Sequence, residues 1–190
     1  MSVVVIFVLG LISGLLLTLM DRIDEHNLLS KNKTLWAYIF AILTALVMIL
    51  SIHYFHFLYP LLFGLCIEWI LKNKIDFPSH VFYLFLMAFY FGYESHLFVH
   101  YWHIVALFLA LRFFTSVWLK NRMDKDSRLY RYFYFSYVEK LVGNIFIAQA
   151  VQEYLILVYG IGFAIASLQT KLHAVKIKNF ITSKYQQGKS

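Results

Sequence analysis

Histidine is the residue type in this 190-residue chain that is best suited to do chemistry. Two short segments hold five histidines and one carboxylate: His53, His56, Glu94, His96, His100 and His103. The last three histidines are spaced i, i+4, i+7, so a helix would present them on one face. Imidazoles from two segments can bind zinc or another divalent metal, ligate haem iron, or exchange protons near neutral pH. The alternative is that these rings only occupy the amphipathic belt at a membrane surface.

A second candidate site consists of polar residues inside apolar segments: Arg112, Glu68, Glu153 and Gln149. Arg112 stands seven residues before Leu119, or ~10 Å along a helix from the basic end of its segment. An ionisable residue at that depth is expected to have a partner, and Glu153 or Glu68 could supply one. Gln149 would share a helix face with Glu153 at i, i+4. Alternatively, Arg112 and Glu68 reach water by snorkelling, and Glu153 lies in an outer loop if two spans flank it.

A third candidate site is acidic and comprises Asp21, Asp24, Glu25 and Asp76. Carboxylates at a membrane surface can hold Mg²⁺ on a lipid diphosphate, because this ion prefers oxygen ligands. The alternative is that they are solvated charges at helix ends. The sequence contains no glycine-rich phosphate loop, nucleophile elbow or HExxH motif, so both enzymatic activity and the identity of any cofactor stay open.

The composition indicates what kind of element must position these residues. The chain is 61% hydrophobic and 14% charged, against a charged share of roughly 25% in soluble domains. Its apolar runs approach the ~20 residues that a helix needs to cross a bilayer. Only two prolines and eight glycines argue against a turn-rich barrel. We therefore predict an all-α fold, a polytopic membrane helical bundle.

The apolar segments predict about six to seven transmembrane spans. They run over residues 2–20, 35–50, 57–71, 81–93 and 97–119, followed by a longer tract at 141–170. Thirty residues of helix would extend ~45 Å, whereas the hydrocarbon core is ~30 Å thick. We predict that this tract breaks, with Gly160 and Gly162 permitting it, into two spans or one span and a re-entrant segment. A single tilted helix is the alternative.

The distribution of cations predicts the orientation. The loops after the first, third and fifth spans hold ten of the seventeen Lys and Arg residues, while the two opposite loops hold none. The positive-inside rule then places the N-terminus outside and the basic tail, residues 171–190, in the cytoplasm. Residues 1–170 form one transmembrane domain, in which the basic and aromatic segment 120–140 is a cytoplasmic loop or an interfacial helix.

These observations favour a small multi-pass protein of the cell (inner) membrane. The bilayer itself, with anionic lipid at the cytoplasmic face, is the expected partner, and other membrane subunits are possible partners as well. The net charge of +7 needs no nucleic acid to explain it. We expect a non-enzymatic transporter, or a subunit or regulator of a membrane assembly, with an intramembrane Arg/Glu site. The alternatives are a membrane enzyme acting on a lipid or isoprenoid, and a metal- or haem-binding protein that uses the outer histidines.

Overall fold

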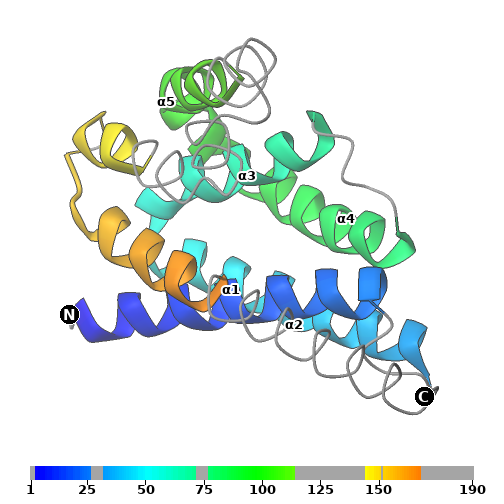
Figure 1. Ribbon diagram of the computed structural model, residues 1–190. Coiled ribbons are helices and arrows are strands. Elements are labelled where there is room, and N and C mark those ends of the chain that lie inside the picture. The colour runs from blue at the N-terminus through cyan, green and yellow to red at the C-terminus, as the bar shows by residue number, and fades with distance from the viewer. Residues whose placement is uncertain (1–2, 27–31, 72–76, 114–143, 151, 168–190) are drawn as a thin grey trace, which may run out of the picture.

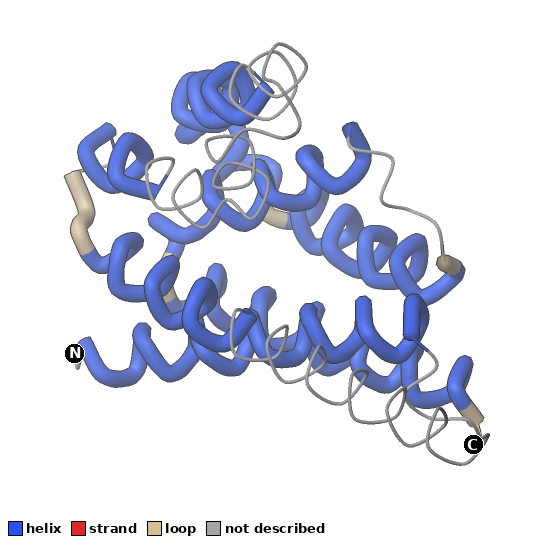
Figure 2. Tube along the Cα trace, viewed as in Figure 1, coloured by secondary structure: helices blue, strands red, loops and turns tan. Residues whose placement is uncertain are grey.

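The computed structural model describes residues 3–26, 32–71, 77–113, 144–150 and 152–167, and within these ranges all regular structure is helical (Figure 2). The helices are α1 (Val3–His26), α2 (Lys33–Tyr54), the short 3-10 helix η1 (His56–Leu58), α3 (Tyr59–Leu71), α4 (Pro78–Tyr93) and α5 (Ser95–Phe113), followed by helices over residues 144–150 and 155–167. The all-α prediction is thus confirmed for the described residues. The segments 120–140 and 171–190 lie outside them.

Helices α1 and α2 lie side by side along one face of the molecule (Figure 1). Their segments Val3–Ile23 and Lys33–Tyr54 are long and apolar enough to cross a membrane, judged by length and composition. At 1.5 Å per residue they extend ~31–33 Å, which matches the hydrocarbon core of a bilayer. The segments His56–Ile70, Ser95–Ala110 and Leu155–Ser167 are apolar but shorter.

Helix α4 has a proline in its first turn and is followed directly by the next helix. Pro78 occupies the first turn, where a missing N–H group breaks no intrahelical hydrogen bond. At the other end, the backbone N–H of Glu94 donates to the carbonyl of Tyr90 at 2.9 Å. Because α5 starts at Ser95, the chain turns a tight corner at Glu94.

The long apolar tract near the C-terminus is broken, as predicted, but at a different place. The helix over residues 144–150 and the helix over residues 155–167 are separated by a turn in which Gln152 has a left-handed φ of 58°. Gly160 and Gly162 lie inside the second helix, so the expectation of a break there is wrong. The single tilted helix is excluded by the same turn.

The glycines serve close helix packing instead. A Cβ atom at Gly10 or Gly14 of α1 would overlap the backbone of Tyr159 or Phe163, and one at Gly162 would press on α1 in return. Two helices can approach this closely only where side chains are missing. The contact runs from Gly10 beside Tyr159 to Thr18 beside Ser167, so the 155–167 helix lies parallel to α1.

Buried hydroxyl groups line the same contact. Tyr159 donates to Ser13 Oγ at 2.8 Å, and Thr18 Oγ1 lies 3.1 Å from Ser167 Oγ and 2.7 Å from the carbonyl of Gly14. These bonds satisfy polar groups that neither lipid nor an apolar core could satisfy. They join segments at opposite ends of the chain into one packed unit.

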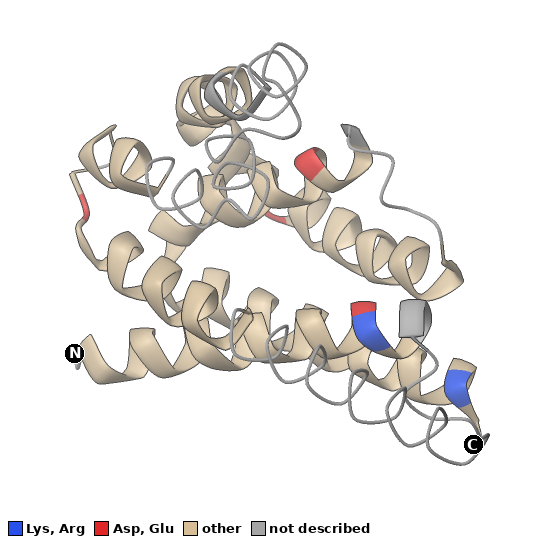
Figure 3. Ribbon diagram, in the orientation of Figure 1, with Lys and Arg blue, Asp and Glu red and all other residues tan. Residues whose placement is uncertain are grey.

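Charged side chains among the described residues lie at helix ends and turns (Figure 3). Asp21, Arg22 and Lys33 lie at one end of the α1–α2 pair. Glu153 precedes the helix that runs parallel to α1, and it therefore lies near the opposite end, where α1 starts. Among the described residues, the charged side chains at the end of α1 and the start of α2 therefore lie far from Glu153.

Candidate functional site along helix α4

Helix α4 carries four protonatable groups toward the interior of the molecule: His80, Tyr83, Tyr90 and Glu94. Their spacing of three, seven and four residues, with buried Met87 between them, keeps them on one helix face. The first and last are fourteen residues apart, which corresponds to ~21 Å along the helix. The two ends of this face hold different polar clusters.

The cluster at the start of α4 pairs His80 with Asp21. Nε2 of His80 lies 3.2 Å from Oδ1 of Asp21, and the side chains are 4% and 26% exposed. The His80 ring is enclosed by Trp69, with ring centroids 5.2 Å apart, and by Phe77 at 5.4 Å. Phe77 in turn lies 5.7 Å from the ammonium group of Lys33. A buried imidazole thus meets a carboxylate that still reaches water.

The cluster at the end of α4 centres on Glu94, which the corner between α4 and α5 turns toward the interior of the molecule. Its residue is 8% exposed, and Oε2 lies 3.5 Å from Nδ1 of His96, whose side chain is exposed. The hydroxyls of Tyr59 and Tyr90 are buried without a hydrogen-bond partner, and both interact electrostatically with the Glu94 carboxylate. Buried hydroxyls normally have a partner, and these two therefore keep the capacity to donate or accept a hydrogen bond near the carboxylate.

Between the two clusters lies a section rich in sulfur. The hydroxyl of Tyr83 donates to Sδ of Met48 at 3.0 Å and lies 3.6 Å from Sγ of Cys66. Thioether and thiol groups are weak hydrogen-bond partners, and Met87 continues the same section on α4. This part of the face is packed and apolar around a single hydroxyl.

The structure describes all five histidines of the predicted metal or proton site. His53, His56, His96, His100 and His103 are all exposed. Of the predicted set, the structure pairs Glu94 with His96. Within the described ranges, no three His, Cys, Asp or Glu side chains are grouped so that they could hold a metal ion. The metal or haem site on these histidines remains a prediction.

The predicted pairing of Arg112 with Glu68 or Glu153 also remains a prediction. Arg112 lies in the last turn of α5, and its side chain is outside the described part of the structure. Glu68 is buried in the last turns of α3. Glu153 lies in the turn that separates the last two helices, where Oε1 accepts from the N–H of Leu155 at 3.3 Å. The expectation that Glu153 and Gln149 share one helix face is wrong, because the chain breaks between them.

Of the acidic group, Asp21 is the member whose side chain the structure describes. Asp24 and Glu25 belong to the last turn of α1, with side chains outside the description, and Asp76 lies outside it altogether. The partner of Asp21 is His80, which sequence reasoning did not single out. The periodic series His80, Tyr83, Met87, Tyr90, Glu94 was the signal that could have revealed it.

The comparisons with known proteins give no family and no relative. No protein-family model, curated protein sequence or solved structure matches this chain. A function must therefore be inferred from the residues themselves.

Proposed function

We propose that this chain is a polytopic membrane protein that moves protons across the bilayer along the inner face of α4. The observation that carries the proposal is the placement of two titratable pairs, Asp21 with His80 and Glu94 with His96, at opposite ends of one helix. The hydroxyls between them, on Tyr83 and Tyr90, can each donate and accept a hydrogen bond. A helix face with such groups can conduct a proton, because a proton does not need a wide channel.

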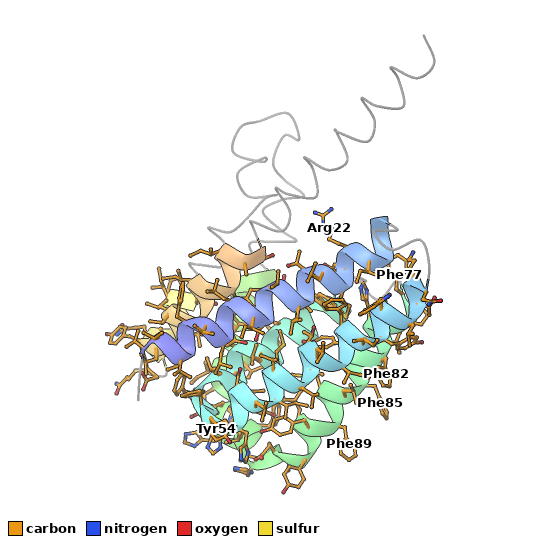
Figure 4. All side chains as sticks on the ribbon, turned by 90° about the horizontal axis from the view of Figure 1, so that it is seen from below. Arg22, Tyr54, Phe77, Phe82, Phe85 and Phe89 are labelled. Carbon is orange, nitrogen blue, oxygen red and sulfur yellow. The ribbon has the colours of Figure 1, made fainter. Side chains whose placement is uncertain are left out.

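The surface of the described helices supports a membrane location with more than two crossings. Large apolar side chains stand outward on four helices, with Val4 65%, Leu46 49%, Phe89 76% and Val99 73% exposed. Figure 4 shows Phe85 and Phe89 of α4 pointing away from the neighbouring helices. A surface of this kind is unfavourable in water and favourable against lipid. The shorter helices can cross if the bilayer thins locally.

The path has two wet ends and a dry centre. At the outer end, exposed His96 takes a proton from water, and Glu94 passes it to the hydroxyls of Tyr90 and Tyr59. Tyr83 lies seven residues before Tyr90 in α4, a distance of ~10 Å along the helix. The transfer from Tyr90 to Tyr83 therefore needs a bridging water or a side-chain movement. The sulfur atoms around Tyr83 make this section the barrier. His80 and Asp21 then release the proton to the inner side.

The test is proton flux in vesicles that contain the purified full chain and an entrapped pH-sensitive dye. A potassium diffusion potential drives the protons, and the change in lumen pH is followed. We expect His80→Ala and Glu94→Gln each to lower the protein-dependent flux at least tenfold. Tyr90→Phe should lower it several-fold, because the path loses a hydroxyl.

Tyr93→Phe is the matched control, since Tyr93 is 77% exposed on the same helix. It should leave the flux unchanged. Flux equal to that of protein-free vesicles would remove the proposal, and full flux in Glu94→Gln would show that the path does not follow α4.

A second candidate function is a membrane enzyme that acts on a lipid diphosphate at the inner face. It is favoured by the contact of Asp21, one of the four acidic residues, with buried His80. This candidate predicts that Mg²⁺ raises the melting temperature of the wild type and not that of Asp21→Asn. An identical response of both proteins to Mg²⁺ would exclude it.

A further inference from the structure

We infer that the hydroxyl groups of Ser51 and Tyr159 carry the proton between Tyr90 and Tyr83, where α4 itself has no protonatable side chain. Residues 84–89 of α4 are Leu, Phe, Leu, Met, Ala and Phe. This inference rests on the proton path proposed above and assigns the groups that complete its centre. The two residues belong to α2 and to the 155–167 helix.

Helices α2 and α4 run in the same direction. Near their starts, the ammonium group of Lys33 lies 5.7 Å from the Phe77 ring. Near their ends, the ring of Tyr59, which begins α3 shortly after α2, packs 5.3 Å from that of Phe91. A residue further along α2 therefore lies further toward the end of α4 that carries Glu94.

Ser51 lies between the levels of the two tyrosines of the path. The Tyr83 hydroxyl meets Met48 of α2, donating to Sδ at 3.0 Å. Ser51 is three residues further along α2, or ~4.5 Å, and it is buried on the same helix face as Met48. Tyr90 is seven residues beyond Tyr83, or ~10 Å along α4. Ser51 thus falls within the interval that the proton must cross.

The Ser51 hydroxyl belongs to a buried network of three hydroxyl groups. It donates to the carbonyl of Val47 at 2.7 Å and also forms a hydrogen bond with the hydroxyl of Tyr159. Tyr159 in turn donates to Ser13 Oγ at 2.8 Å, and Ser13, Ser51 and Tyr159 are fully buried. Hydroxyl groups from three helices therefore meet in an interior that is otherwise apolar.

Such hydroxyls can pass a proton without gaining or losing an atom, because each both donates and accepts a hydrogen bond. An incoming proton binds the oxygen, and the hydrogen already bonded to that oxygen leaves for the next one. The hydroxyls then rotate back to their original orientation. No metal, cofactor or second reactant is needed.

Tyr83 is held in a way that lets it join this network. A thioether is a weak hydrogen-bond acceptor, so the Tyr83 hydroxyl is bound only weakly to Met48. The Tyr159 hydroxyl is close enough to interact electrostatically with Tyr83, and its oxygen is the stronger acceptor. A turn of the Tyr83 side chain from Met48 toward Tyr159 is the movement that the path requires.

The test uses the full chain in vesicles with an entrapped pH-sensitive dye, and a potassium diffusion potential drives the protons. We expect Tyr159→Phe and Ser51→Ala each to lower the protein-dependent flux at least threefold. The double variant should conduct no less than the poorer single variant, because both substitutions interrupt one route. Circular dichroism and gel filtration establish that each variant is folded, and Ser51→Ala decides the matter if Tyr159→Phe is not.

Thr18→Val is the matched control for a purely structural role. It removes the contact between Thr18 and Ser167, whose hydroxyl oxygens are 3.1 Å apart in the same helix interface, and nearly preserves the side-chain volume. It should lower the melting temperature and leave the flux unchanged. An equal loss of flux in Thr18→Val and Tyr159→Phe would show that packing is responsible, and it would overturn the inference.

Failure of this inference is distinguishable from failure of the proposed function. Flux that falls in Glu94→Gln but is unchanged in Tyr159→Phe and Ser51→Ala would overturn the role of the two hydroxyls alone. Wild-type flux equal to that of protein-free vesicles would overturn the proposed function, and this inference with it.

Discussion

Gly10 and Gly14 are the residues whose identity the packing of this protein fixes most directly. Each occupies a point where the backbone of the 155–167 helix leaves no room for a side chain. We predict that Gly14→Val lowers the free energy of unfolding by about 1–3 kcal/mol, because the helices must separate to accommodate it. Thermal unfolding in detergent measures this, as a fall in the melting temperature.

Gly92 offers a matched control on a different helix. A Cβ atom there would meet nothing within 4 Å, so Gly92→Ala should be neutral or slightly stabilising. If both substitutions have the same effect, close approach of α1 to the 155–167 helix does not determine stability.

The residues of the candidate site were predictable in part. Glu94 and His96 were found from sequence because they stand in a visible histidine-rich segment. His80 was missed because it lies alone near a proline, and its partner Asp21 is 59 residues away in the sequence, so only the folded chain brings them together. Tyr59 and Tyr90 were not predicted as site residues for another reason. Tyrosine is common at membrane surfaces, so neither residue stood out in the sequence.

At the scale of elements, the contact between α1 and the 155–167 helix depends on hydroxyls as well as glycines. We predict that Tyr159→Phe destabilises the protein by about 0.6 kcal/mol, the usual size of a buried hydrogen bond between membrane helices. Tyr154→Phe, at a tyrosine that is 63% exposed, should change the melting temperature less. A double-mutant cycle with Ser13→Ala isolates the bond, and additive effects of Tyr159→Phe and Ser13→Ala would show that it contributes nothing.

Helix positions followed from hydrophobic runs, whereas the break in the last tract did not. Apolar length required an interruption somewhere between residues 141 and 170, and glycine was the natural place to expect it. The interruption instead lies at Gln152, and the glycines are explained by a neighbour that lies far away in the sequence. The pair Gly10 and Gly14 has the spacing GxxxG, a local sign of such packing that was available from the start.

The whole molecule has two chemically distinct ends, and their orientation in a membrane can be measured. In a Cys66→Ala background, single cysteines replace Tyr54 at the end of α2 and Leu35 near its start, which are 70% and 58% exposed. We predict that a membrane-impermeant maleimide labels Tyr54→Cys in intact cells and Leu35→Cys only after permeabilisation. The reverse pattern would invert the topology, and labelling of both in intact cells would exclude a spanning α2.

The parallel contact between α1 and the 155–167 helix also sets the order in which the protein can be completed. Thr18 and its partner Ser167 are 149 positions apart, so a ribosome that adds ~5–20 residues per second needs about 7–30 s to supply the second after the first. During that interval the glycine-containing face of α1 lacks the helix that it packs against in the finished protein. The contact between α1 and the 155–167 helix therefore forms late in synthesis, which makes a prematurely terminated chain a substrate for quality control even when its first helices have already formed.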